Sequence, residues 1–358
     1  MKHVSADQHL SPTDDGAQPR CEPAGDSLYG LRIESIVTAT DVLIDVPECP
    51  VCQCQRARPR FSVEQFESRV VECVECGLGR LHPLPTADEL MALYPLAYYG
   101  TAGSKFRGLV EIMVRIVGAR QSRFLARHIP PGGRALDVGC GRAVALSALH
   151  ARRIEPHGFD VVPHAVEGLD PRIHVRVAPS LVEANYPSGF FDGVIVWHVL
   201  EHVPDPGVLL REVHRIMKPN GVLIVAVPNF SSLQARWAGA DWFHLDLPRH
   251  LFHFPLAALT RLVTDCGFTC DAGHHFSLRQ NPFGWVQSAL NRIPWLPRCG
   301  LYELLHRHSA RDRLPFTPAI RFQLRLAYWL LMPLGLLLSI VAAAARSGAT
   351  AHIVARRK

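Results

Sequence analysis

The stretch "RALDVGCGRA", Arg134–Ala143, is an apolar run that ends in an aspartate and then in two glycines separated by a cysteine. A strand, a glycine turn and an immediate helix form the unit with which doubly wound α/β proteins hold a nucleotide, because bare backbone N–H groups can approach the ligand there. A dinucleotide fingerprint would have a third glycine, and Val144 stands in its place. The stretch therefore predicts a nucleotide-type site, with another nucleotide favoured over a dinucleotide.

The sequence on either side alternates between strand-like and helix-like segments, which favours a parallel sheet covered on both faces. A helix start is marked by Asp205 as N-cap and Pro206 at the first position. We expect strands at 134–139, 156–161, 173–177, 191–200, 222–228, 268–277 and 349–357. We expect helices at 106–128, 143–153, 206–217 and 255–267, and a turn at 218–221. The predicted fold is α/β, with a doubly wound, mostly parallel seven-stranded sheet.

Composition limits the classes of partner. The 358 residues are 48% hydrophobic, which supports a sizeable core, and the net charge of +6 is only mildly basic. The basic residues are scattered, so no nucleic-acid arm is indicated. Residues 1–27 are polar and rich in Pro, Asp and Gly, which predicts a disordered tail without a secretory signal. A cytoplasmic location follows from this and from the clustered cysteines.

Two C-x-x-C pairs, Cys49–Cys52 and Cys73–Cys76, are separated by a 20-residue spacer. Each pair can supply two thiolates from one tight turn, so we expect a structural Zn²⁺ site of four cysteines. The site would define a zinc-ribbon region at 31–95, with Cys54 as a spare thiol. Four buried or incidental cysteines are the alternative.

The alternation stops after Ser277, and residues 278–348 form an apolar insert before the last strand at 349–358. Its uncharged run, 326–345, is long enough to span a bilayer. A full crossing would place the last strand on the wrong side of the membrane. Because Pro333 and Gly335 divide the run, we favour a helical hairpin or an interfacial docking helix, with a buried or dimer-forming helix as another option. Three arginines flank the run: Arg321, Arg325 and Arg346.

Several segments together resemble the class I S-adenosylmethionine (SAM) dependent methyltransferases over 134–277, and they predict a SAM-binding domain at 106–277. They are "LDVGCG", "GFD", "FDGVIVWHVLEHVPDP" and "MKPNGVLIVAVPN". A subgroup of that family with an N-terminal four-cysteine ribbon, "YYG" and "PRHLFHF" (Pro248–Phe254) is similar over most of the chain. The resemblance implies a Rossmann-like fold and SAM as the cofactor.

The resemblance also implies which residues hold SAM. Asp137 and the turn Gly139–Cys140–Gly141 would bind the methionine portion, and Asp160, 19 residues past Gly141, would bind the ribose. Asp137 could instead cap a helix, and Trp197 could be a plain core residue. The remaining expected contacts are Val161, Ser180 and Leu181 at the adenine, and Trp197 with His198 beneath the sulfonium.

Methyl transfer from a sulfonium needs alignment, and it needs a base only if the acceptor must lose a proton. Candidate groups lie on two loops that should leave the carboxyl edge of the sheet. The catalytic residues we predict are His198 first, then His250 and His202. Each of them could also have a structural role. Other candidates are Glu201, His244 and His253, and the trio His244, His250 and His253 could also be interpreted as a metal cluster.

The function predicted from the sequence is SAM-dependent methyl transfer to a small or lipid-linked acceptor, such as a glycan, a glycolipid or a quinone precursor. "EHVPDP" is similar to a phrase of the quinone-ring O-methyltransferases. A membrane surface, at the cytoplasmic face of the inner membrane, is a further candidate partner. The alternatives are a non-catalytic binding scaffold and a nucleic-acid methyltransferase. The latter is disfavoured because "WHVLEH" replaces the N-P-P-Y-like exit from the fourth strand.

Overall fold

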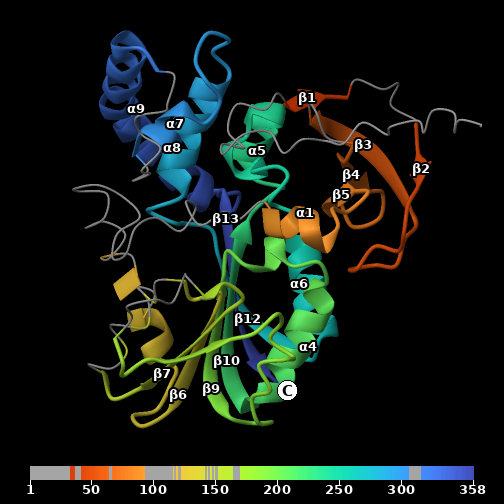
Figure 1. The fold of residues 1–358 in the computed structure, drawn as a ribbon, viewed down its shortest axis with the longest axis vertical. Coiled ribbons are helices and arrows are strands. Elements are labelled where there is room, and N and C mark those ends of the chain that lie inside the picture. The colour runs from red at the N-terminus through yellow and green to blue at the C-terminus, as the bar shows by residue number, and fades with distance from the viewer. Residues whose placement is uncertain are drawn as a thin grey trace, which may run out of the picture.

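The structure is a computed structural model that describes residues 33–36, 42–63, 67–92, 116, 118–119, 122–141, 143, 146, 149, 152–163, 170–305 and 316–358. The expected tail at 1–27 and most of the helices expected at 106–128 and 143–153 lie outside these residues. The described chain forms two sheets and a group of helices beside them (Figure 1).

The larger sheet has seven strands in the order β12-β13-β10-β9-β6-β7-β8. Parallel pairing joins β8, β7, β6, β9 and β10, whereas β13 is antiparallel to both of its neighbours. This confirms the predicted α/β sheet and its last strand. The bounds are β6 Arg134–Val138, β7 Glu155–Asp160, β8 His174–Val177, β9 Phe191–Trp197, β10 Met217–Pro228, β12 Phe268–His274 and β13 Thr350–Arg357.

Buried apolar runs place β9 and β10 at the centre of this sheet. Residues 194–196 and 222–227 are at most 2% exposed, as expected for parallel strands covered on both faces. Helices α4, Pro206–Ile216, and α6, Leu256–Asp265, follow the predicted pattern, and Asp205 caps α4 by accepting from Val208 N–H at 2.8 Å. The turn expected at 218–221 instead lies within β10, as an irregularity in its register with β9 between Met217 and Val222.

The smaller sheet contains the cysteine region and one strand from far along the chain. Strand β11, Phe252–His253, pairs with β5, Gly79–His82, so the "PRHLFHF" segment completes the N-terminal sheet. This contact was not predicted, and it fixes the two sheets to each other. The other strands are β1 Ile33–Ser35, β2 Ile44–Asp45, β3 Arg56–Val63 and β4 Arg69–Cys73. Short helices complete the connections: α1 Ala87–Ala92, η4 Leu200–His202, α5 Leu233–Ala238, η5 Gly239–Asp241 and η6 Phe243–Leu245.

The insert contains α7 Asn281–Asn291, α8 Gly300–Leu305 and α9 Pro318–Ala344, which lie together at one end of the molecule (Figure 1). The expected helical hairpin is wrong, because α9 is a single helix with Pro333 inside it. A proline removes one helical hydrogen bond but fixes a φ angle that a helix accepts. Buried Gly335 packs against the backbone of α7, which stabilises the segment in one piece.

Gly335 provides a test of this packing. A Cβ at this position would lie 2.7 Å from the carbonyl oxygen of Pro282, so Gly335→Ala must push α9 away from α7. We expect a loss of about 1–3 kcal/mol in the free energy of unfolding, as for other overpacked sites. Denaturant unfolding measures it. Leu337→Ala, at an exposed position of the same helix, is the control and should change stability little. An unchanged Gly335→Ala variant would contradict the described α7–α9 contact.

Candidate functional site

The glycine turn after β6 is shaped for close approach. Gly139 and Gly141 have φ angles of +70° and +47°, a region that disfavours side chains. A Cβ on Gly139 would overlap the Val199 side chain, which comes from the loop after β9. Only glycine therefore fits between the two loops, and the turn lies directly against the segment that carries His198. This contact with Val199 was not predicted from the sequence.

Asp160, the last residue of β7, joins two loops at the carboxyl edge of the sheet. Its carboxylate accepts one hydrogen bond from Gly141 N–H at 2.9 Å and another from Val162 N–H at 3.0 Å. The side chain is 7% exposed, and Asp137 on the neighbouring strand β6 is 8% exposed. Two buried carboxylates thus flank the glycine turn, at the position that the sequence predicted.

The two carboxylates have perturbed acidities. Burial, together with the nearby charge of Asp160, raises the pKa of Asp137 to about 7. Burial also raises the pKa of Asp160, although the N–H groups of Val162 and Gly141 oppose the shift. Both shifts mean that negative charge is disfavoured here without a compensating cation. A positively charged ligand would remove that cost.

His198 begins the loop after β9 in a strained conformation, with φ at +53°. Its Nδ1 lies 3.0 Å from Glu201 Oε1. Burial lowers the pKa of His198 to about 3 and raises the pKa of Glu201 to about 7. The imidazole is therefore neutral, and its partner exchanges a proton near neutral pH. Such a pair can accept a proton at Nε2 if Glu201 is ionised.

The structure brings the predicted histidines together around Glu201. Ligand atoms of Glu201, His202 and His250 all lie within 4.8 Å of one another. The Nδ1 atoms of the two histidines lie at hydrogen-bond distance from backbone carbonyls. His202 Nδ1 is 3.0 Å from Arg249 O, and His250 Nδ1 is 2.9 Å from His244 O. This leaves the Nε2 atoms facing other partners, and His250 Nε2 is 3.7 Å from Asp246 Oδ2. The group has the chemistry of a proton relay or of a divalent-cation site.

The described residues do not place His244, His250 and His253 together as a metal cluster, the interpretation that the sequence left open. Within the described residues, the two groups with metal-ligand spacing are the four cysteines and Glu201–His202–His250. His253 Nε2 instead lies 3.0 Å from Leu245 O, and its backbone pairs with β5. His244 Nε2 lies against Gly284 of α7, where a Cβ would come within 2.8 Å of it.

His352 was missed by the sequence analysis. It lies in β13 opposite Ala226 of β10, which in turn pairs with Trp197 of β9. The Trp197 and His352 ring centroids are 4.4 Å apart. Burial lowers the pKa of His352 to about 3, so this ring is also neutral. No motif marks His352; only the antiparallel register brings it to the site.

The residues expected at the adenine occupy different environments. Leu181 is buried at 3% exposure, whereas Val161 is 55% exposed and available to a flat ring. The hydroxyl of Ser180 donates to Glu183 Oε1 at 2.8 Å and accepts from Glu183 N–H at 3.2 Å. Ser180 therefore shapes its own turn, and the three adenine contacts stay predictions.

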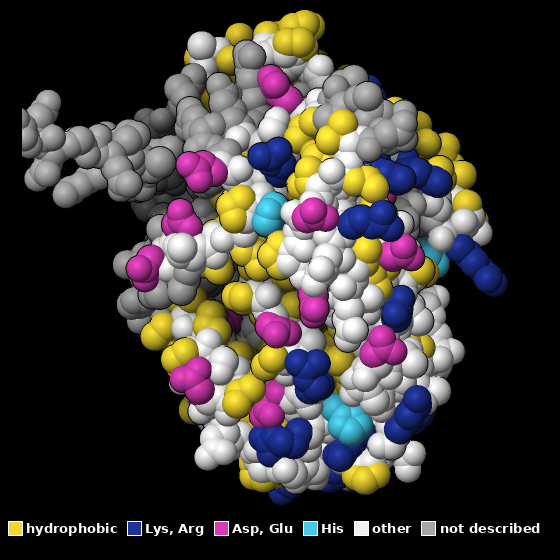
Figure 2. All heavy atoms as spheres, turned by 90° about the vertical axis from the view of Figure 1, so that its right-hand side faces the viewer, with side chains coloured by type: hydrophobic (Ala, Val, Ile, Leu, Met, Phe, Trp, Pro, Cys, Tyr) yellow, Lys and Arg dark blue, Asp and Glu magenta, His cyan; other side chains and the backbone are white. Residues whose placement is uncertain are grey.

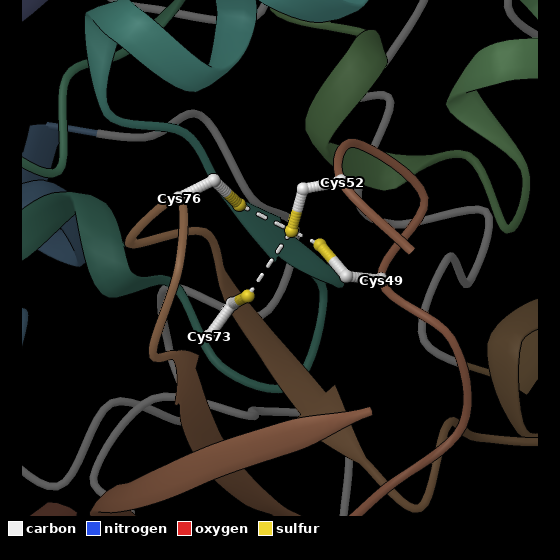
Figure 3. A group of neighbouring side chains, drawn as sticks. All are labelled: Cys49, Cys52, Cys73 and Cys76. Carbon is white, nitrogen blue, oxygen red and sulfur yellow. Dashed lines mark hydrogen bonds between the residues drawn. The ribbon is translucent and has the colours of Figure 1, made fainter. Parts of the chain in front are cut away.

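The four cysteines of the two C-x-x-C pairs point toward one another (Figure 3). Sγ of Cys49 lies 3.6 Å from Sγ of Cys76, and Sγ of Cys52 lies 3.4 Å from Sγ of Cys73. Each pair is followed by a residue with positive φ, Gln53 at +64° and Gly77 at +70°, so the chain turns sharply at both. Four sulfurs at this spacing suit a tetrahedral Zn²⁺ ion.

Acidity and packing around the cysteines agree with such a site. A hydrogen bond from Cys76 lowers the pKa of Cys49 to about 5, whereas its interaction with Cys49 raises the pKa of Cys76. The thiolate is the form that binds metal. Beside the pair, the buried Arg80 donates to Glu48 O at 2.8 Å and to Pro47 O, which holds the segment that leads into Cys49.

Comparisons with known proteins agree with this architecture. Residues 111–272 match the methyltransferase domain family. A ubiquinone biosynthesis O-methyltransferase of Xanthomonas oryzae is 32% identical over 132 residues, 34% of this chain and 55% of that enzyme. A demethylmenaquinone methyltransferase of Lysinibacillus sphaericus is 23% identical over 202 residues, 54% of this chain and 77% of that enzyme.

A solved SAM-dependent methyltransferase of Archaeoglobus fulgidus is 18% identical, with a TM-score of 0.43, and the comparison covers 68% of this chain and 93% of that one. The chain spans about half the length of the Xanthomonas relative that it matches. The segment from 111 to 272 is a match to the methyltransferase domain family, and the four-cysteine region and the α9 insert lie outside that segment.

Proposed function

We propose that this chain is a SAM-dependent methyltransferase. The observation that carries the proposal is the glycine turn between two buried carboxylates, Asp137 and Asp160, at the carboxyl edge of the sheet. The turn lies where the strand order reverses, between β6 and β9, and ligands of open α/β sheets bind there. The family match over 111–272 supports the same activity.

Different residues of the site would bind different parts of SAM. Backbone N–H groups at Gly139–Gly141 and the carboxylate of Asp137 suit the charged methionine portion, and Asp160 suits the ribose hydroxyls. Asp160 already accepts from Gly141 N–H, so the same carboxylate would hold the turn and the sugar. Val161 and Leu181 would then lie along the adenine.

When bound, SAM supplies an electrophilic methyl group on a sulfonium. The acceptor atom would take this methyl group as the carbon–sulfur bond breaks with its electron pair on sulfur, so the chain's own residues would contribute chiefly alignment. Trp197 and His352 would form the wall that orients the acceptor. An acceptor hydroxyl would lose its proton to His198 Nε2, and ionised Glu201 would stabilise the imidazolium through Nδ1.

For the acceptor we propose a quinone-type precursor with a ring hydroxyl. The names of the Xanthomonas and Lysinibacillus relatives support a quinone-type acceptor, and that of the Xanthomonas enzyme, an O-methyltransferase, supports a hydroxyl as the methylated group. Lipid-linked glycans and glycolipids are the remaining acceptor classes, and the reaction would take place in the cytoplasm. For the four cysteines we propose one structural Zn²⁺ ion, since their sulfurs gather from two tight turns.

Two rival functions have less support. A non-catalytic scaffold would not need the buried carboxylate pair, which costs stability unless a ligand compensates it. A nucleic-acid methyltransferase would require a concentrated basic surface. On the face shown in Figure 2, basic and acidic side chains are interspersed rather than gathered into a stripe.

Calorimetry with SAM and with its demethylated product tests the proposal. We expect both to bind the wild-type protein, and Asp160→Ala to weaken binding roughly ten- to hundred-fold, the value of hydrogen bonds to a charged group. Asp265→Ala, which removes an exposed carboxylate of α6, is the matched control and should bind normally. The absence of binding to the wild-type protein would rule out the proposed function.

The affinity for SAM should depend on pH through Asp137. Because its pKa is raised to about 7, the free protein holds this carboxyl largely protonated at pH 6, and a cationic ligand must displace that proton. SAM should therefore bind about tenfold more weakly at pH 6 than at pH 8. Asp137→Asn should bind weakly at both pH values and flatten this profile. A wild-type profile that is flat between pH 6 and 8 would contradict the role of Asp137.

The cysteine cluster should bind zinc. We expect the purified chain to contain about one zinc ion and Cys73→Ser to lose it, since a structural site needs all four thiolates. Cys54→Ser is the matched control, because this neighbouring thiol contacts Arg56 O rather than the cluster. Elemental analysis of the purified variants measures the metal. If Cys73→Ser retains zinc, the four cysteines are not its ligands.

A further inference from the structure

Helix α9 exposes a broad apolar surface. Of its 27 residues only Leu324, Gly335, Ser339 and Ala342 are buried. Trp329 and Leu330 are each 66% exposed, and Leu337 is 57% exposed. We define the α9 face as the exposed apolar residues Phe322, Leu326, Trp329, Leu330, Pro333, Leu334, Leu336, Leu337, Ile340 and Val341.

The width of the α9 face distinguishes it from a helix-pairing surface. At 3.6 residues per turn these side chains cover an arc of about 160°. A coiled-coil seam uses a narrower stripe and places charges beside it. Residues 326–345 carry no charge, and α9 as a whole contains no acidic residue. Its length and composition would be sufficient to cross a membrane, and 17% of its apolar window is buried.

The apolar surface continues beyond α9. A groove of about 460 Å³ runs between α5, α7 and α9 and has an almost entirely apolar lining. Leu233 and Trp237 of α5 are lining residues that are 37% and 44% exposed. The patch therefore extends over several elements, which is a feature of a binding surface rather than of scattered exposed residues.

Basic residues lie at the ends of this surface. Arg325 is exposed beside the first residues of the α9 face, and Arg346 is exposed just after α9 ends. Arg292, directly after α7, lies over the Trp237 ring at 4.9 Å. Tryptophan and arginine around an apolar face are the side chains that lie at the boundary between lipid headgroups and acyl chains. Arginine also favours anionic lipids.

The fold decides how α9 could meet a bilayer. Strand β13 begins six residues after the last residue of α9, and it lies between β10 and β12 in the main sheet. The other side of α9 packs on α7, and Leu324 joins a core with Leu301 and Leu304 of α8. Both ends and one side of α9 are thus attached to the same folded body, which leaves only the opposite side for lipid.

We propose that the α9 face docks this protein onto an anionic lipid bilayer, with the helix axis along the membrane surface. The inference concerns a binding partner beyond methyl transfer, and it stands whichever acceptor is used. It also predicts the orientation: the α9 face and the groove beside it contact the acyl chains, and Arg325 and Arg346 contact the headgroups.

Vesicle flotation with the full chain tests the proposal. We expect the protein to float with phosphatidylcholine vesicles that contain phosphatidylglycerol, and more weakly with phosphatidylcholine alone. Arg325→Gln should weaken binding to the anionic vesicles about fivefold, as each basic residue near the surface contributes about 1 kcal/mol. Leu330→Asp with Leu337→Asp should weaken it more than tenfold, since the transfer of two exposed leucines into the bilayer is lost.

The matched control is Leu84→Asp with Val208→Asp, which places two charges at exposed apolar positions of α4 and of the segment after β5. It should float like the wild type, and thermal unfolding should be unchanged in all variants. If the α9 double variant unfolds, Trp329 provides a second readout. Brominated acyl chains should quench tryptophan fluorescence in the wild type, and Trp329→Phe should reduce the quenched fraction, leaving the part that comes from Trp237 of the groove.

Three outcomes would overturn the proposal. One is a folded wild-type protein that neither floats nor is quenched. The second is a stable dimer, measured by light scattering, that Leu330→Asp with Leu337→Asp dissociates while wild-type protein ignores vesicles; the α9 face would then pair two copies of this chain. The third is resistance to alkaline carbonate extraction from cell membranes, which would indicate a spanning helix.

Discussion

The hydrogen bonds of the Asp160 carboxylate to Gly141 N–H and Val162 N–H hold the candidate site together. They tie the turn after β6 to the end of β7, and the Val199 side chain closes against the same turn from β9. The ends of the three neighbouring strands β9, β6 and β7 therefore meet around the glycine turn that this carboxylate holds.

The same arrangement carries an electrostatic cost. Asp137 and Asp160 are both buried, which raises the pKa of each, and the charge of Asp160 raises the pKa of Asp137 in the same direction. The neighbouring pair of His198 and Glu201 is also shifted toward its neutral forms. The free site is thus poor in charge although it is rich in ionisable groups. A cationic ligand changes that balance, because it favours the ionised carboxylates that the empty fold disfavours.

Much of the fold could be predicted because local chemistry encodes it. The strands around the glycine turn are continuous apolar runs. The start of α4 is marked by the N-cap Asp205 and by Pro206 at its first position. The four cysteines were predictable as a group because each C-x-x-C pair makes its own turn. The carboxylates of the site follow strand ends, and parallel strands bring such ends to one edge.

What could not be predicted depends on contacts between distant segments. His352 reaches Trp197 only through the register of β13 with β10. The pairing of β11 with β5 joins residues more than 150 positions apart, and two residues of strand carry no periodic signal. Pro333 suggested a break in the apolar run, but packing of Gly335 against α7 outweighed that local preference.

The position of β13 has a consequence for how the chain acquires its structure. This strand follows α9 in the sequence but lies between β10 and β12 in the sheet. During synthesis, both of those strands must wait with unpaired edges until the whole insert has left the ribosome. Closing such a long loop is slow and exposes the intermediate to aggregation. The insert therefore delays completion of the main sheet until β13 has been synthesised.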